Sequence, residues 1–369
     1  MRLPRHRATT RHLAAIYPFQ AERGLGACGT YVGTNVTAGD EAWCFDPFEL
    51  YRQGVITSPN VMVFGQVGAG KSAAVKTFLY RSVGVLGSPN GHRRWCGIID
   101  PKGEYGRLAE ALGLTVIKLY PGGPTKLNPL DPGPTVERDT ADQRHAARLA
   151  LLSALFVRTL GRSLTPVEDA AIAAVLESFD SCGATPTLRD VGGCLADPTD
   201  HMQQALRTQR DQLARELRDL SLGTGRLLSG DLRGMFDNAS TERIDWNGPG
   251  VVIDVSAVLH DDHQLGLVML CATAWLQALV ASPTGSGSVP HRYLVSDEDW
   301  AVLRDPVTAR FKQASFKLSR TYGVCNIGIT HRIADLRSQA DDGTSTAKIA
   351  MGLLADTQTR IVFQQPDDQ

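Results

Sequence analysis

The stretch Gly65-Gln-Val-Gly-Ala-Gly-Lys-Ser72 is the strongest fold signal in this chain. It fits the pattern G-x-x-x-x-G-K-S, in which glycines let the backbone curl so that its amides converge on phosphate oxygens. An apolar run, Val61–Phe64, precedes the stretch, and a helical pattern begins at Lys71. A phosphate-binding loop requires this strand–loop–helix context, so the stretch predicts a nucleotide site at the helix N-terminus.

We expect nine consecutive residues of this loop to bind the nucleotide. Lys71 is placed to reach the β- and γ-phosphates, which also makes it a catalytic candidate, and the Ser72 hydroxyl is placed to coordinate Mg²⁺. A nucleotide and Mg²⁺ are therefore the expected cofactors, and ATP is favoured over GTP because the sequence contains no Asn-Lys-x-Asp motif. The nine residues are Gly65, Gln66, Val67, Gly68, Ala69, Gly70, Lys71, Ser72 and Ala73.

Apolar β runs and helical patterns alternate on both sides of the loop. Such alternation indicates an α/β fold with a mainly parallel central sheet flanked by helices. Further strands are expected at residues 30–32, 95–99, 115–119, 251–255, 293–296, 325–330 and 360–364, and a buried helix at 265–281.

The residues from 136 to 236 carry almost no strand pattern. We expect helices there at Ala141–Leu160, at 166–179 and at 201–220. The predicted organisation is therefore an N-terminal segment at 1–55 whose short strands pack on the α/β domain, that domain at 56–134 and 237–369, and an all-α inserted subdomain at 135–236.

Composition limits the class of protein. The 369 residues carry 38 Lys+Arg and 39 Asp+Glu, so a uniformly basic nucleic-acid coat is excluded, although a local basic lining is not. The seven cysteines form no Cys-x-x-Cys pair, which favours reduced thiols in a cytoplasmic protein. The apolar helix at 265–281 falls at the short edge of a membrane span, and its charged left flank favours a buried helix.

A nucleotide site also needs an acid at the end of a second strand. Asp297 and Glu298 follow one predicted strand, and Asp254 follows another. The tandem pair suits hydrolysis, since one carboxylate holds the metal and the next deprotonates the attacking water. We therefore expect Asp297 to bind the metal and Glu298 to act as general base, with Asp254 as a strand-end cap.

Three further polar features remain open at this stage. The cluster from Asp100 to Glu104 is either a capped turn or a contact to the phosphates or the water, and its role stays open. His331 follows the strand at 325–330 and is a candidate sensor of the γ-phosphate. Arg320 is either a surface residue or an arginine that reaches the site of a neighbouring subunit.

Together these motifs resemble the conjugation and type IV secretion ATPases, within the HerA/FtsK-like branch of the RecA-type P-loop ATPases. Besides the loop, the resemblance rests on IIDPKGEY at 98–105 and on SDEDW at 296–300, whose DE-x-W pattern discriminates best. Shorter stretches follow in the family's order: LNPLD at 127–131, GMFD at 234–237 and VVIDVS at 251–256. The family usually has glutamine where this chain has His331, and a neutral imidazole can still donate one hydrogen bond.

The resemblance implies a RecA-like ATPase that energises transfer of DNA or protein across the cell envelope. It implies self-assembly, with a hexamer expected and a monomer as the alternative for the isolated chain. Other secretion-channel proteins would be partners, with DNA as a further candidate, and the protein would be cytoplasmic or held at the inner face of the membrane through its partners. Two alternatives remain: a DNA-translocating coupling-type ATPase, and a nucleotide-gated assembly subunit with little turnover.

Overall fold

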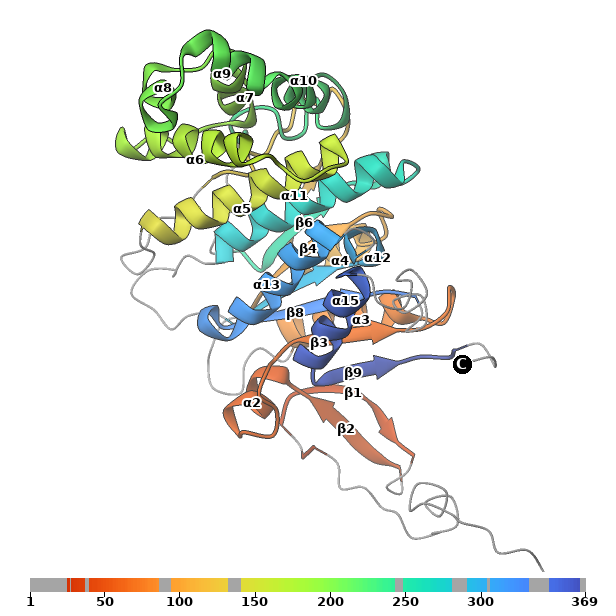
Figure 1. Cartoon of the computed structure of the whole chain (residues 1–369). Coiled ribbons are helices and arrows are strands. Elements are labelled where there is room, and N and C mark those ends of the chain that lie inside the picture. The colour runs from red at the N-terminus through yellow and green to blue at the C-terminus, as the bar shows by residue number, and fades with distance from the viewer. Residues whose placement is uncertain are drawn as a thin grey trace, which may run out of the picture.

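A computed structural model describes most of the chain. The described residues are 25–26, 28–36, 40–85, 94–131, 141–242, 248–280, 291–303, 306–331 and 345–365. Figure 1 shows the hairpin of the N-terminal segment at one end, the sheet in the middle and a stack of helices at the other end.

A seven-stranded sheet forms the centre of the molecule, in the order β5-β6-β4-β7-β8-β3-β9. Every neighbouring pair in it is parallel, which confirms the predicted α/β class. The strands are β3 (Val61–Phe64), β4 (Arg94–Asp100), β5 (Thr115–Lys118), β6 (Gly250–Asp254), β7 (His291–Ser296), β8 (Val324–Ile329) and β9 (Thr359–Val362).

The sheet is buried on both faces, because side chains alternate between two hydrophobic clusters. In β4, for example, Cys96 and Ile98 face one cluster while Trp95 and Ile99 face the other. The first cluster is covered by α2 (Pro47–Arg52), α3 (Lys71–Leu79) and α4 (Gly106–Leu112). The second is covered by α11 (Asp262–Val280), α12 (Trp300–Leu303) and the helices of the inserted region.

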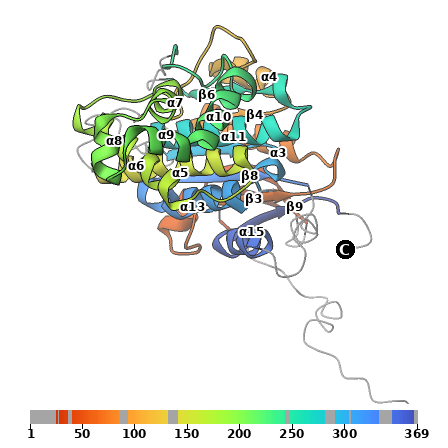
Figure 2. The same cartoon turned by 45° about the horizontal axis from the view of Figure 1, so that its top comes forward.

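A third cluster covers the β3 end of the sheet. Met62 and Phe64 of β3 pack there against α13 (Pro306–Tyr322) and α15 (Ser345–Asp356). Figure 2 shows α15 beside β3 and β9 at this end. The strand that leads into the phosphate loop is therefore fully enclosed.

Between β5 and β6 the described residues form helices and no strand. They are α5 (Ala141–Leu160), α6 (Pro166–Ser181), α7 (Leu188–Ala196), α8 (Asp200–Leu206), α9 (Arg210–Glu216), α10 (Arg218–Arg226) and η3 (Leu227–Asp231). In Figure 1 they stack beyond α11, and α5 packs directly on α11 and α13. The apolar core thus runs without interruption from this region to the sheet.

The prediction of one helix at 201–220 is wrong, because three helices occupy this stretch and α7 precedes them. The break falls at Arg207, the C-cap of α8, which adopts a left-handed φ of 51°. Met202, Leu213 and Leu220 are nevertheless all fully buried. The apolar spacing identified the buried positions correctly but did not reveal the turn between them.

Helix α11 is long and apolar enough to cross a membrane, and no other helix among the described residues is. In the structure 78% of its apolar window is buried by the rest of the chain. It packs against α5, α13 and β4, which confirms the predicted buried helix.

The N-terminal hairpin consists of the antiparallel strands β1 (Thr30–Asn35) and β2 (Glu41–Phe45). Short strands were expected in this segment, but only the first was located from the sequence. Asp46 follows β2 and caps α2 by accepting hydrogen bonds from the amides of Phe48 at 3.0 Å and Glu49 at 3.4 Å. The Asp46 carboxylate also forms a buried ion pair with Arg94 at the start of β4, and Arg94 donates to the Tyr293 hydroxyl at 2.5 Å.

We expect Arg94→Met to destabilise the protein strongly, because it would leave the Asp46 carboxylate buried without a counter-charge. Breaking such a pair costs about 3–5 kcal/mol. Urea unfolding of the two proteins measures the change. Arg210→Met is the control: it removes an exposed ion pair with Asp197, and we expect no measurable change from it. Equal effects of the two substitutions would contradict this account of the hairpin attachment.

Candidate nucleotide-binding site

The predicted phosphate loop joins β3 to α3. Gly68 and Gly70 adopt left-handed φ angles of 82° and 91°, and Gly70 is the N-cap of α3. The start of the loop is held by the segments that follow β8 and β9: the Gly65 amide donates to the carbonyl of His331 at 2.7 Å, and the Gln66 amide to that of Gln364 at 3.0 Å. Residues 65–70 thus form a turn at the carboxyl edge of the sheet, and residues 71–73 begin α3.

The loop leaves several backbone amides available to a ligand. Within the described part of the chain, the amides of Gly68, Gly70 and Ser72 have no acceptor. Amides at a helix N-terminus, together with the helix dipole, favour an anion such as a phosphate. The residues of the loop therefore fit a nucleotide phosphate.

Lys71 is 8% exposed and is folded back onto its own loop. Its ammonium group donates to the carbonyls of Gly65 at 2.8 Å and Gln66 at 3.0 Å. Burial lowers the pKa of Lys71, and the nearby Glu298 and Asp297 carboxylates offset part of that change. Lys71 must exchange these carbonyls for phosphate oxygens if it is to contact a nucleotide.

Asp297 lies directly after β7 and is 2% exposed. It accepts a hydrogen bond from the Tyr105 hydroxyl at 3.2 Å, and the Ser72 side chain lies near its carboxylate. Burial raises the pKa of Asp297, and the nearby Ser72 hydroxyl opposes the rise. The two predicted metal ligands, Ser72 and Asp297, thus lie near each other although β8 separates their strands, and their oxygen atoms fit a Mg²⁺ ion.

Glu298 is buried and has three side-chain partners. One carboxylate oxygen forms an ion pair with Lys102, and the other is contacted by the Trp300 indole N–H and, at 3.0 Å, by His331 Nε2. Burial alone would raise the pKa of Glu298, but the hydrogen bonds from these partners outweigh it and lower the pKa to about 2. Its φ of 55° is strained for a residue with a side chain, a feature that clusters at functional sites.

The structure places the predicted sensor His331 in the site but does not describe the side chain of Arg320. His331 follows β8 and reaches Glu298, with its ring 6.4 Å from that of Trp300, so it lies inside the site. Its Nδ1 atom is buried and has no partner among the described residues. The backbone of Arg320 lies near the end of α13, but its side chain is outside the described residues, so its expected role stays a prediction.

The Asp100 cluster forms a capped turn, which is one of the two roles left open by the sequence, while a contact to the phosphates or the water stays a prediction. Asp100 accepts hydrogen bonds from the amides of Lys102 at 3.2 Å, Glu104 at 3.1 Å and Tyr105 at 2.9 Å, so it caps the turn. From this turn Lys102 and Tyr105 then reach Glu298 and Asp297. Asp254, the alternative acid, accepts from the Ser256 amide at 3.0 Å, as expected of a strand-end cap.

Sequence reasoning missed a third acid in the same run. Asp299 is fully buried and pairs with Lys312 of α13 at 3.1 Å, and its amide donates to Ile329 of β8 at 2.9 Å. Burial raises the pKa of Asp299, and Lys312 opposes the rise. The consecutive acids at 297–299 were a visible signal, but the partner lies in a helix whose register the sequence did not give.

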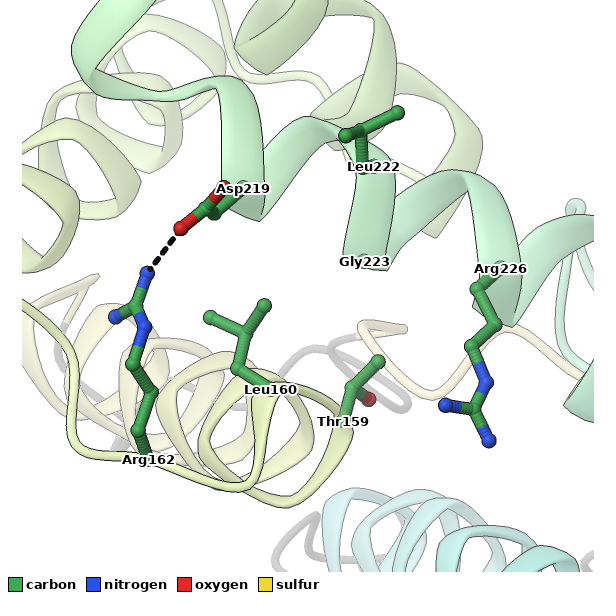
Figure 3. A pocket seen from close by; sticks show the side chains of 7 residues that line it. All are labelled: Thr159, Leu160, Arg162, Asp219, Leu222, Gly223 and Arg226. Atoms are coloured by element: carbon green, nitrogen blue, oxygen red, sulfur yellow. Dashed lines mark hydrogen bonds and ion pairs between the residues drawn. The ribbon is translucent and has the colours of Figure 1, made fainter.

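A separate pocket of about 380 Å³ lies in the helical region, far along the chain from the phosphate loop. Figure 3 shows it between the end of α5 and α10, with Arg162 turned toward Asp219 at 3.2 Å. None of its lining residues is a predicted site residue; they are Thr159, Leu160, Arg162, Asp219, Leu222, Gly223 and Arg226.

Comparison with solved structures supports the fold. The chain is similar to VirB4 of Thermoanaerobacter pseudethanolicus, with a TM-score of 0.72 and 20% sequence identity over 94% of this chain and 87% of that chain. It is also similar to the bacterial conjugative coupling protein TrwBdeltaN70, with a TM-score of 0.53 and 15% identity over 92% of this chain and 72% of that chain. No protein-family model matches the sequence, and no curated protein does.

The pH dependence of stability should report the ion pairs of Glu298. Because the folded-state pKa of about 2 lies below the ordinary 4.5, the ionised side chain stabilises the fold above about pH 4.5. That contribution is lost as the pH falls toward 2. We expect the free energy of unfolding of wild type, relative to that of Glu298→Gln, to be constant from pH 7 to 5. This difference should shift against wild type as the pH falls from 4.5 to 3. Urea unfolding at each pH measures it; a difference that stays flat down to pH 3 would contradict the assigned contacts.

Proposed function

We propose that this chain is an ATP-hydrolysing motor of a conjugation or type IV secretion apparatus, which energises transfer of DNA or protein across the cell envelope. The observation that carries the proposal is the convergence of the acids after β7 with the phosphate loop. His331 contacts Glu298 at 3.0 Å and holds the Gly65 amide at 2.7 Å, and Lys71 and Ser72 lie near the two acids. This is the arrangement that phosphoryl transfer from a Mg²⁺-bound nucleotide requires. Similarity of fold to VirB4 and to a conjugative coupling protein supports the biological setting.

The residues divide the chemistry among themselves. Within the loop at 65–73, the amides of Gly68, Gly70 and Ser72 and the Lys71 ammonium group bind and orient the phosphates, while Ser72 and Asp297 would hold Mg²⁺. When bound, the metal ion supplies charge neutralisation to the phosphate oxygens. Glu298 orients the attacking water and accepts its proton at a carboxylate oxygen, and His331, which already touches Glu298, senses the terminal phosphate.

Assembly and location belong to the same proposal. We infer a hexamer in which Arg320 of one subunit completes the site of the next, since an arginine supplied by a neighbour stabilises charge during phosphoryl transfer. Other secretion-channel proteins are the proposed partners, with DNA as a further candidate. The protein would act in the cytoplasm, at the inner face of the membrane, and reach that membrane only through its partners.

Two alternatives have specific support. A coupling-type DNA translocase agrees with the TrwB similarity, but the TM-score of 0.53 is below the 0.72 for VirB4, so we place it second. A nucleotide-gated subunit with little turnover agrees with the three partners that occupy Glu298. Stimulation of phosphate release by DNA, falling steeply with salt, would favour the translocase.

We expect Glu298→Gln to bind ATP but to release phosphate about 10²–10⁴-fold more slowly, because it removes the general base. Lys71→Ala should weaken ATP binding itself, by about tenfold or more, because it removes a charge-assisted contact to the phosphates. Phosphate release and equilibrium binding, measured in parallel over a range of protein concentrations, separate the two effects.

The matched control is Lys118→Ala, which removes an exposed lysine from β5 at the far edge of the sheet. We expect it to behave as wild type in both measurements. Wild-type protein that binds ATP and shows no turnover at any concentration would favour the nucleotide-gated alternative. Wild-type protein that binds no ATP would overturn the proposed function.

Arg320 is tested by mixing inactive variants. We expect Arg320→Ala and Glu298→Gln each to lack turnover and their mixture to regain part of it, because one subunit type can then offer an intact Glu298 and the other an intact Arg320. Phosphate release from the equimolar mixture is the measurement. A mixture as inactive as its components would contradict the shared site.

A further inference from the structure

Lys102 is the most exposed of the three residues whose side chains contact Glu298. Its side chain is 33% exposed, against 27% for His331, while the Glu298 side chain is only 6% exposed. The Lys102 ammonium group and one Glu298 oxygen form an ion pair at the mouth of the site. Lys102 therefore has a route toward solvent and toward any ligand that enters there.

The charges around Lys102 point to a second partner. Its positive charge acts on Lys71, lowering the pKa of that ammonium group, while Asp297 and Glu298 act on both lysines with the opposite sign. Two lysines and two carboxylates thus share one site. A terminal phosphate bound at the loop would bring further negative charge beside Lys102 and compete with Glu298 for it.

The backbone that carries Lys102 is fixed, whereas its long side chain ends in the ion pair with Glu298. Asp100 holds the turn through three amides, and Gly103, at a φ of 69°, packs close to Ser256. A lysine ammonium is a compact charge on a flexible four-carbon stem with three donors. The ion pair can therefore break without refolding of the turn.

Glu298 needs such a release in order to act as a base. A carboxylate has about four acceptor positions. Trp300 and His331 occupy one oxygen and Lys102 the other, so little remains for a water molecule. Departure of Lys102 would free one entire oxygen while Trp300 and His331 continue to hold the carboxylate in place.

We propose that Lys102 is a nucleotide-sensing residue that pairs with Glu298 in the absence of a triphosphate and moves onto the terminal phosphate when one binds. The inference rests on the proposed function. It adds a second phosphate-binding lysine to the site and makes release of the base depend on the third phosphate. ADP, which lacks that phosphate, would leave the Lys102–Glu298 pair intact.

The test is a double-mutant cycle on binding, with the non-hydrolysable analogue AMPPNP and with ADP, both with Mg²⁺. We expect Lys102→Met to weaken AMPPNP about tenfold more than ADP, since it removes a charge-assisted contact to the third phosphate only. We expect Glu298→Gln to tighten AMPPNP about threefold or more, because it removes the competitor for Lys102. In the Lys102→Met background the same change should have no such effect.

Lys118→Met is the matched control, and we expect the ratio of its affinities for AMPPNP and ADP to equal that of wild type. Lys102→Arg should keep most of that ratio, because it keeps the charge. Equal weakening of AMPPNP and ADP by Lys102→Met, or tightening by Glu298→Gln that persists without Lys102, would overturn the inference and leave the proposed function standing. If thermal unfolding shows that Lys102→Met does not fold, the test is the ratio of the affinities of Glu298→Gln for AMPPNP and ADP. A ratio equal to that of wild type would then overturn the inference. Wild-type protein that binds neither nucleotide would overturn the proposed function and this inference together.

Discussion

The parallel pairing of β3, β8 and β7 is the constraint on which the site depends. In a parallel sheet all carboxyl ends meet at one edge. The phosphate loop leaves β3, His331 leaves β8, and Asp297 and Glu298 leave β7, so three segments far apart in the sequence meet there. Backbone hydrogen bonds between the strand ends then lock the loop, as between the Gly65 amide and the His331 carbonyl at 2.7 Å.

The site concentrates features that are unfavourable elsewhere in a protein. Three consecutive acids are buried, burial raises the pKa of Asp297 and Asp299, and Glu298 adopts a left-handed backbone conformation. Isolated charges at such positions would be costly, and each here has a partner of opposite charge or a hydrogen-bond donor. The surrounding core of large apolar side chains on both faces of the sheet supplies the stability that permits this arrangement.

Much of this fold could be predicted from the sequence, because buried parallel strands read as short apolar runs with polar ends. Val61–Phe64 and the run that became β7 were found for that reason, and Asp297 and Glu298 with them. The helix expected at 201–220 failed because apolar spacing is blind to a single residue in a left-handed turn, here Arg207. The contact of Lys102 with Glu298 could not be predicted either, because it depends on β4 lying next to β7 in the sheet.

The anchoring of the phosphate loop has a consequence for the order of folding. The Gln66 amide is held by the carbonyl of Gln364, and β3 lies between β8 and β9, so the loop is completed by segments some 260 to 300 residues further along the chain. During synthesis these partners leave the ribosome long after the loop itself, and contacts of such high sequence separation form slowly. A nascent chain therefore carries the loop without the strands that shape it until those later segments have been made. Nucleotide would stabilise the finished domain rather than guide its early folding.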